Sequence, residues 1–129
     1  MKKKYKIVAL IGESGSGKDS VLKEVIATHP EFNKIITCTT RPPREYEIDG
    51  VDYHFYSTDE FVHEIWGKEI VEYSVFNTWF YGTCKRDLKK DQINVGVFNP
   101  TSVRILLKDP ECDVLVLYVR ASDKERLLR

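Results

Sequence analysis

The sequence predicts an α/β fold, in which helices flank a parallel β-sheet and a mainly antiparallel subdomain is inserted into the chain. Two observations lead to this prediction. Residues 6–11 and 114–119 are short and almost wholly apolar, which is typical of strands buried on both faces of a parallel sheet. Residues 33–83 are instead aromatic and polar and contain Pro-Pro and Asp-Gly turn signals. We therefore assign residues 1–34 and 84–129 to the core and residues 35–83 to the insert.

The first strand, residues 6–11, leads through a glycine-rich turn into a helix. In that helix the apolar pairs Val21/Leu22 and Val25/Ile26 recur four residues apart, as in a helical stripe. We expect the helix to end near His29, because the following proline disfavours helical geometry in the residue before it.

A second helix is expected inside the insert, at residues 58–66. Ser57 and Glu60 have the spacing of a capping box at its start, and Gly67 supplies an end. The rest of the insert is expected to form short strands and turns, with His54 in a structural role.

After Cys84 the sequence again contains short apolar runs that are typical of strands in a parallel sheet. Residues 93–98 are expected to form a strand, and Asn99-Pro100 has the pattern of an N-cap followed by proline at the first helical position. The strand at residues 114–119 follows a turn at Asp109-Pro110. Ser122 and Glu125 then form another capping box, which predicts a helix from residue 123 onward.

Composition restricts the class of protein. The 129 residues are enough for one domain, and 20 basic residues balance 20 acidic ones, so the formal net charge is zero. Neutrality argues against a nucleic-acid partner, and no apolar run approaches the roughly 20 residues that cross a bilayer. The three cysteines are widely spaced and fit neither a disulfide framework nor a metal site. We therefore expect a cytoplasmic protein without a membrane partner.

The glycine-rich turn at residues 12–18, Gly-Glu-Ser-Gly-Ser-Gly-Lys, has the composition of a phosphate loop. It lies between a buried strand and a helix start, which is the context that this motif requires. Its backbone N–H groups and the helix N-terminus attract phosphate oxygens, and Lys18 can reach the β- and γ-phosphates of a nucleotide. The expected phosphate-binding residues are Gly12, Ser14, Gly15, Ser16, Gly17, Lys18, Asp19 and Ser20.

One position departs from the motif. The residue after the lysine is normally Ser or Thr, whose hydroxyl binds Mg²⁺, but here it is Asp19. A carboxylate is a good ligand for Mg²⁺, so Asp19 is the candidate metal ligand. Ser20 points about 100° away around the helix and is not assumed to replace it.

A second candidate phosphate site lies at Arg41-Pro42-Pro43-Arg44. Two guanidinium groups on a proline-stiffened segment suit bidentate contacts with phosphate. Considered alone, these residues fit a surface loop with two solvated arginines better than a phosphate site.

The segment does not stand alone. Together with residues 12–18, the run Gly-Val-Asp-Tyr-His-Phe at 50–55, Glu72 and Tyr81-Gly82-Thr83, it resembles the guanylate kinase family. The order and spacing match across essentially the whole chain, and residues 39–55 are the most specific part. The resemblance implies a P-loop NTPase-type core and an inserted subdomain that binds GMP. It also implies an ATP-dependent nucleoside monophosphate kinase that transfers the γ-phosphoryl group of ATP to GMP or dGMP with Mg²⁺.

The resemblance also implies roles for individual residues. Arg41 and Arg44 would hold the acceptor phosphate, to which Tyr53 and Tyr81 would donate their hydroxyls. Thr37, Glu72 and Thr83 would contact guanine. A carboxylate at Glu72 agrees with this role, because it can accept two parallel N–H bonds from guanine that adenine does not offer. The expected catalytic residues are Lys18, Arg41, Arg44, Arg126 and Arg129.

The chain departs from the family pattern in two further places. The strand at residues 93–98 lacks the acidic residues that family members usually carry, and Asp19 could supply the missing charge. The family also continues past this point with a lid, so we expect the chain to be part of a longer kinase. Arg126 matches the first arginine before the lid, and Arg129 lies one residue closer than usual to the second. Two alternatives stay open: a catalytically weak or silent binding module, and a kinase for another deoxynucleoside monophosphate.

Overall fold

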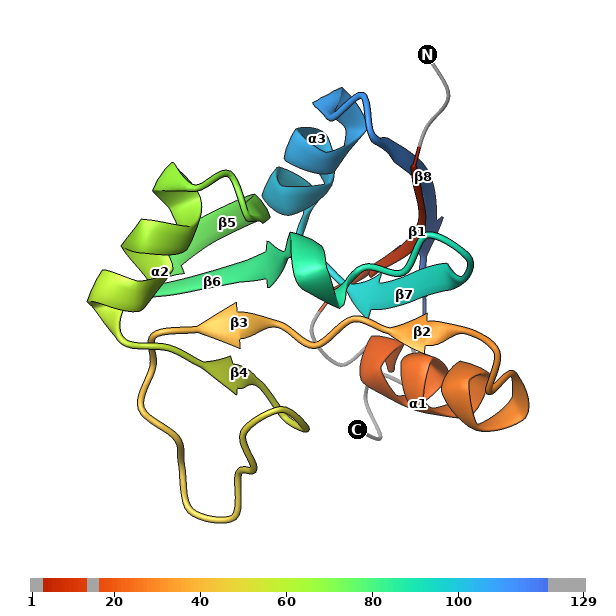
Figure 1. Ribbon diagram of the computed structural model, residues 1–129. Helices are drawn as coiled ribbons and strands as arrows, with labels where there is room; N and C mark the ends of the chain where they lie inside the picture. Colours follow the sequence, from red (N-terminus) through yellow and green to blue (C-terminus); the bar gives the residue numbers. More distant parts are fainter. Residues whose placement is uncertain (1–3, 14–16, 121–129) are drawn as a thin grey trace. The chain divides into compact units, whose positions relative to one another are not determined.

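The structure is a computed structural model and describes residues 4–13 and 17–120 (Figure 1). Its contacts divide the chain into two compact units. Unit 1 comprises the described residues of Met1–Lys34 and Lys89–Arg129, and unit 2 comprises Ile35–Leu88. Each unit contains one four-stranded sheet. The chain therefore leaves the first sheet, builds the second one, and returns.

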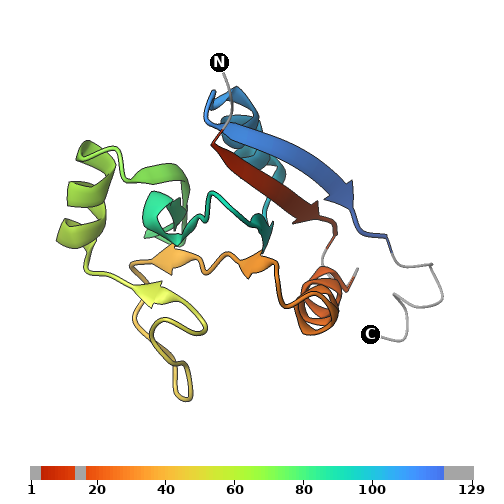
Figure 2. The ribbon, with the colours of Figure 1, turned by 45° about the vertical axis from the view of Figure 1, so that its right-hand side comes forward.

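Unit 1 is built around a parallel sheet with the strand order β2-β7-β1-β8. The helices α1 and α3 lie on opposite sides of this sheet in both views (Figures 1 and 2). This arrangement confirms the predicted α/β core. The strands are β1 (Tyr5–Ile11), β2 (Asn33–Lys34), β7 (Ile93–Val97) and β8 (Cys112–Tyr118), and the helices are α1 (Lys18–Thr28) and α3 (Pro100–Lys108).

The central strand β1 is covered on both faces. Leu10 packs with Leu22 of α1 and Val95 of β7 in one buried cluster. Ile7 and Ala9 point to the opposite face, because side chains alternate along a strand, and they are also buried. The prediction of a doubly buried strand is therefore confirmed for β1.

The same prediction is wrong for β8. Leu115, Leu117 and Tyr118 are 58%, 45% and 53% exposed. The physical reason is position: in the described part of the chain β8 is the outermost strand of its sheet, and α3 packs against only part of it. Its apolar sequence resembles that of β1, but its surroundings in the described residues differ.

The helix ends of unit 1 follow the predicted local signals. The Asn99 side chain accepts a hydrogen bond from the backbone N–H of Ser102 at 2.8 Å, and Pro100 is the first residue of α3. The helix α1 ends at His29, as expected from Pro30. The helix predicted from residue 123 lies outside the described residues.

Among the residues that are described, no helix is long and apolar enough to cross a membrane.

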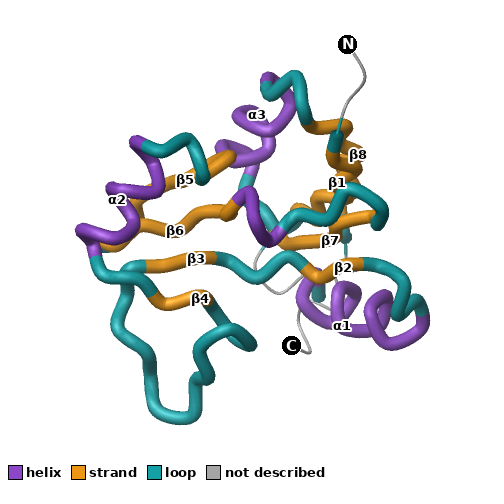
Figure 3. Tube along the Cα trace, viewed as in Figure 1, coloured by secondary structure: helices purple, strands orange, loops and turns teal. Residues whose placement is uncertain are grey.

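Unit 2 contains the second sheet, with the strand order β4-β3-β6-β5 (Figure 3). Two of its pairings, β3 with β6 and β5 with β6, are antiparallel, and β3 with β4 is parallel. The predicted insert is thus mainly antiparallel, as expected. Its elements are β3 (Cys38–Thr39), β4 (His54–Phe55), α2 (Thr58–Trp66), β5 (Ile70–Phe76), β6 (Trp79–Cys84) and the 3₁₀ turn η1 (Lys85–Asp87).

The helix α2 covers this sheet. Its capping box is present, with Ser57 accepting from the Glu60 N–H at 3.0 Å and Glu60 accepting from the Ser57 N–H at 2.8 Å. Phe61 of α2 is fully buried and stacks on Phe80 of β6, with ring centroids 5.0 Å apart. The end at Gly67 is also as predicted.

Two contacts within unit 2 join residues that are distant in the sequence. Cys38 and Cys84 form a buried disulfide across 46 residues of sequence. The expectation that the cysteines form no disulfide is therefore wrong: Cys38 pairs with Gly82 in the sheet, which brings Cys84 near on the adjacent strand. In addition, the Asp87 carboxylate accepts a hydrogen bond from the Ile36 N–H at 2.7 Å. This bond joins the beginning and the end of the unit.

Candidate functional site

The first candidate site lies between β1 and α1 in unit 1. The Lys18 ammonium group donates a hydrogen bond to the Gly12 carbonyl at 3.0 Å, which closes the turn. Gly17 caps the helix with φ of 91°, a conformation that favours glycine. The predicted residues Ser14, Gly15 and Ser16 lie outside the described residues. The described part presents an ammonium group beside the positive end of a helix, a combination that attracts anions.

Asp19 and Ser20 follow in the first turn of α1, and both are exposed. The described residues contain no group of three His, Cys, Asp or Glu side chains that could hold a metal ion. The strand β7, Ile-Asn-Val-Gly-Val, contributes no carboxylate. A metal here would therefore need phosphate oxygens and water to complete its coordination.

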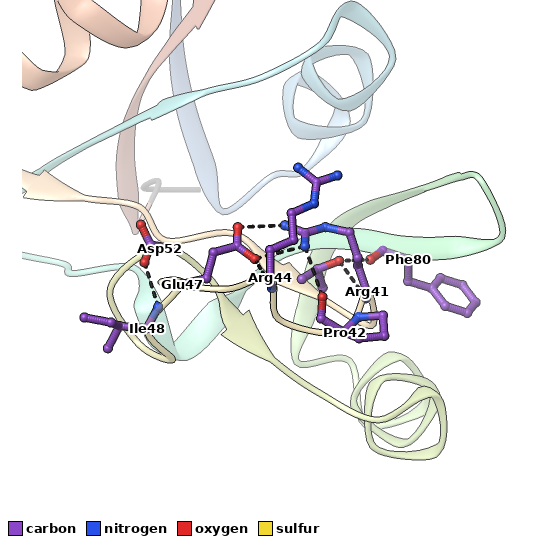
Figure 4. Close-up of polar contacts among 8 residues, drawn as sticks. Arg41, Pro42, Arg44, Glu47, Ile48, Asp52 and Phe80 are labelled. Carbon is purple, nitrogen blue, oxygen red and sulfur yellow. Dashed lines mark hydrogen bonds and ion pairs between the residues drawn. The ribbon is translucent and has the colours of Figure 1, made fainter.

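The second candidate site lies in unit 2 and is centred on Arg41, which is only 4% exposed (Figure 4). Its guanidinium group donates one hydrogen bond to each carboxylate oxygen of Glu47, both at 2.9 Å, and a third to the Pro42 carbonyl at 3.0 Å. It also lies over the Tyr53 ring, 5.1 Å from the centroid. The hydrogen bonds with Glu47, followed by those with Tyr53 and Tyr81, raise the pKa of Arg41. The structure thus brings Arg41, Tyr53 and Tyr81 together.

Glu47 is the member of this cluster that the sequence did not predict. One of its oxygens also accepts a hydrogen bond from the Arg44 backbone N–H at 2.6 Å. The bonds from Arg41 and then from Arg44 lower the pKa of Glu47 from 4.5 to about 2. The side chain of Arg44 is exposed and extends away from the Arg41–Glu47 pair (Figure 4). The only sequence signal for Glu47 was a carboxylate six residues after Arg41, which is too common to single out.

Glu72 and Thr83 form a third, buried feature of unit 2. The Thr83 hydroxyl donates to a carboxylate oxygen of Glu72 at 2.9 Å, and the two residues are 5% and 1% exposed. They are direct partners across β5 and β6, just after a register shift in β5. Gly82 permits this approach, since a Cβ atom there would lie 2.6 Å from the Glu72 carbonyl oxygen. The pair places a carboxylate and a hydroxyl at one position of the sheet, as recognition of a base edge requires.

The remaining predicted residues divide into two groups. Thr37 directly precedes β3, and its backbone carbonyl accepts a hydrogen bond from the His54 N–H at 2.9 Å. His54 contacts Asp87 at 3.4 Å, in keeping with its expected structural role. Arg126 and Arg129 lie outside the described residues.

Comparison with known proteins gives one consistent family. The family model described as guanylate kinase matches residues 4–128. The guanylate kinase of Sulfurimonas denitrificans is 46% identical over 84 residues, which cover 65% of this chain and 41% of that protein. The guanylate kinase of Salinibacter ruber is 32% identical over 130 residues, covering 95% of this chain and 68% of that protein.

The fold agrees with a solved structure. The crystal structure of guanylate kinase from Anaplasma phagocytophilum matches all of this chain and 66% of its own, with a TM-score of 0.66 and 21% identity. That identity supports the fold alone. Several of the matched curated relatives are much longer than the matched region: the chain spans about half of their length, between 41% and 49% for three of them.

Proposed function

Since this chain belongs to the guanylate kinase family, we propose that it carries the nucleotide sites of an ATP-dependent nucleoside monophosphate kinase. The proposed reaction moves the γ-phosphoryl group of ATP to the phosphate of GMP or dGMP, with Mg²⁺. The two nucleotides are the proposed partners. The proposed location is the cytoplasm, where we expect the Cys38–Cys84 disulfide to be reversible.

The observation that carries this proposal is the pairing of two different recognition features within unit 2. Arg41, Tyr53 and Tyr81 form a compact cationic and hydroxyl-bearing cluster suited to a phosphate. Glu72 and Thr83 offer a carboxylate and a hydroxyl suited to the N–H edge of guanine. On strand β6, Tyr81 and Thr83 are two residues apart, so both features share one strand. In this proposal the segment 35–83 is the GMP-binding subdomain.

The proposed reaction requires little covalent chemistry from the protein. The attacking oxygen of the acceptor phosphate is already anionic, so no general base is needed. The protein instead aligns two phosphates and neutralises charge, which is how phosphoryl transfer is catalysed in general. Lys18 is the proposed donor-side cation, with the loop from Gly12 to Ser20 around the ATP phosphates. Arg41 and Arg44 are the proposed acceptor-side cations, and Arg126 and Arg129 are proposed to act on the transferring group.

Mg²⁺ fits the donor side through a single protein carboxylate. Asp19 is exposed in the first turn of α1, next to Lys18, and Mg²⁺ sites commonly use one or two carboxylates with substrate phosphates and water. Asp19 is therefore the residue proposed to hold the ion. When bound, Mg²⁺ neutralises charge that develops on the phosphate oxygens.

The test is an assay of ADP release with ATP and each of the common ribo- and deoxynucleoside monophosphates. It should be run on this chain and on any longer protein that contains it. Turnover with GMP or dGMP alone supports the proposal. Turnover with another nucleotide would move the assignment to a different monophosphate kinase.

A second candidate function is a binding module that is catalytically weak or silent and recognises a partner or only a nucleotide. The absence of a carboxylate on β7 favours it. Lys18, Arg41 and Glu72 oppose the form of this module that binds only proteins, because such a module has no evident need of them. Measurable GMP binding without turnover, in a longer protein that contains this chain, would decide for the module.

A further inference from the structure

We propose that Glu47 is a positioning residue for the acceptor phosphate, which acts by fixing the direction of the Arg41 guanidinium group. This inference rests on the proposed function, because it concerns the same acceptor site. Glu47 is one of two glutamates in the loop that follows Arg41, the other being Glu45, and the structure gives them different environments. Glu47 is bound to Arg41 and to the loop backbone, whereas Glu45 is exposed.

The contacts of Glu47 fix its carboxylate from both sides. One oxygen accepts from Arg41 at 2.9 Å and from the Arg44 N–H at 2.6 Å, and the other accepts from Arg41 at 2.9 Å (Figure 4). The Glu47 N–H also donates to the Arg44 carbonyl at 3.0 Å, which closes a tight turn. Tyr46 within this turn has φ of 71°, a conformation that non-glycine residues seldom adopt. The turn therefore holds Glu47 in one place at some conformational cost.

This arrangement leaves Arg41 a defined set of donors. A guanidinium group has five N–H donors. Two of them bind Glu47 and one binds Pro42, which leaves two for other partners. The Tyr53 ring centroid lies 5.1 Å from the central carbon of this guanidinium group, and the Tyr81 ring lies 6.3 Å from that of Tyr53. A phosphate that binds Arg41 at this end would meet both tyrosines.

The charge of Glu47 does not explain how this residue would favour phosphate binding. Its carboxylate neutralises Arg41 and would repel an incoming phosphate, so it weakens the simple electrostatic attraction of the site. Its benefit must therefore be geometric. Arg41 is almost fully buried, and a buried cation without a partner would be expelled toward solvent or rearranged. The bidentate bond keeps the guanidinium group inside the cluster and in one orientation.

The test measures GMP and guanosine binding to the 129-residue chain by calorimetry, in the parent protein and in four variants. Glu47→Gln keeps the size of the side chain but breaks one of the two parallel bonds. Glu45→Gln removes the same charge from the same loop and is the matched control. Arg41→Gln, alone and combined with Glu47→Gln, tests whether Glu47 acts through Arg41.

We expect Glu47→Gln to weaken GMP binding by about 10- to 100-fold, the cost of misdirecting a hydrogen-bonded charge. Guanosine, which has no phosphate, should bind within about twofold of the parent, and Glu45→Gln should change neither affinity. In the Arg41→Gln background the Glu47→Gln change should have no further effect.

Three results would overturn the inference. GMP binding that is unchanged or tighter in Glu47→Gln would show that Glu47 does not position Arg41 or that it competes with phosphate. Equal loss of GMP and guanosine, or loss of the folded state, would show a general structural role. Additive effects of the two substitutions would show that Glu47 does not act through Arg41. The proposed function fails separately, if the parent binds GMP no more tightly than guanosine.

Discussion

The two candidate nucleotide sites are built in different ways. In unit 1 the site is one contiguous turn, in which Lys18 is held by a backbone carbonyl and the helix start supplies the other donors. In unit 2 the residues of the site come from a loop and several strands. Two of its charged side chains already have partners inside the protein: Arg41 binds Glu47, and Glu72 binds Thr83. A ligand is expected to meet a ready cation in the first site. In the second it must fit a preformed network, so geometry rather than net charge should control its binding.

The largest effect is expected from the contiguous site. Lys18→Met should lower the rate of phosphoryl transfer by about 10³-fold, because it removes the described cation of the turn that is proposed to bind the ATP phosphates. The rate is measured as ADP release on this chain or on a longer protein that contains it. Lys23→Met, an exposed lysine on the same helix, is the control. A similar loss in both variants would mean that the turn has no special role.

The next effect concerns the disulfide of unit 2. Reducing Cys38–Cys84 should lower the free energy of unfolding of this unit by about 2–4 kcal/mol, because the bond closes a loop of 46 residues in the unfolded chain. Hydrogen exchange with and without a reductant measures it. Protection should fall in residues 35–88 and change little in β1 and α1. A Cys38→Ser variant should show no response to the reductant.

A smaller effect is expected from Glu72 and Thr83, the pair proposed to contact guanine. Glu72→Gln keeps the shape of the side chain but replaces one acceptor oxygen by a donor. It should weaken GMP binding by about 10- to 100-fold and leave ATP binding unchanged. Glu69→Gln, an exposed neighbour at the start of the same hairpin, serves as the control. If the affinities for GMP and AMP changed together, Glu72 would not be the residue that selects the base.

The metal ligand gives a smaller effect again. Asp19→Ser should shift the Mg²⁺ concentration needed for ATP binding by about tenfold, because a charged ligand is replaced by a neutral one. Titration of ATP affinity against Mg²⁺ measures the shift. An unchanged Mg²⁺ dependence would exclude Asp19 as a substitute for the carboxylates missing from β7.

The smallest expected effect is on stability in acid. The pKa of Glu47 is lowered to about 2 in the folded chain, so its ionised form stabilises the fold above its ordinary pKa of 4.5. That contribution should be lost as the pH falls from about 4.5 to about 2. Urea unfolding at several pH values should show a weaker pH dependence in Glu47→Gln than in the parent. Equal slopes would contradict the pairing seen in the structure.

The comparison of the two sites also explains what the sequence can predict. The phosphate-loop turn, the Ser57–Glu60 capping box and the Asn99-Pro100 helix start are each set by neighbours within a few residues, and the described parts follow the prediction. The bounds of β1, β7 and β8 are nearly as predicted, because short apolar runs mark strands.

The features that the sequence missed depend on how the chain folds back on itself, over 46 residues for the disulfide and over six for Glu47. Cys38 meets Cys84 only because β3 pairs with β6. Glu47 matters only because a turn brings its carboxylate back to Arg41. The exposure of Leu115 and Leu117 depends on which elements lie beside β8, and an apolar run cannot report that. Features set by neighbouring residues can be predicted from the sequence, whereas contacts that depend on the tertiary structure cannot.

The hydrogen bond between Asp87 and Ile36 has a consequence for how such a protein can be modified. It joins Ile36 and Asp87, each one residue from an end of unit 2, so the two ends of the segment lie close together. A host chain that receives such a segment needs only to open one loop, since the ends of the insert are already adjacent. If this segment is the acceptor subdomain, as proposed, its selectivity for a base could be exchanged in one recombination event. The sheet of unit 1 would not need stepwise redesign.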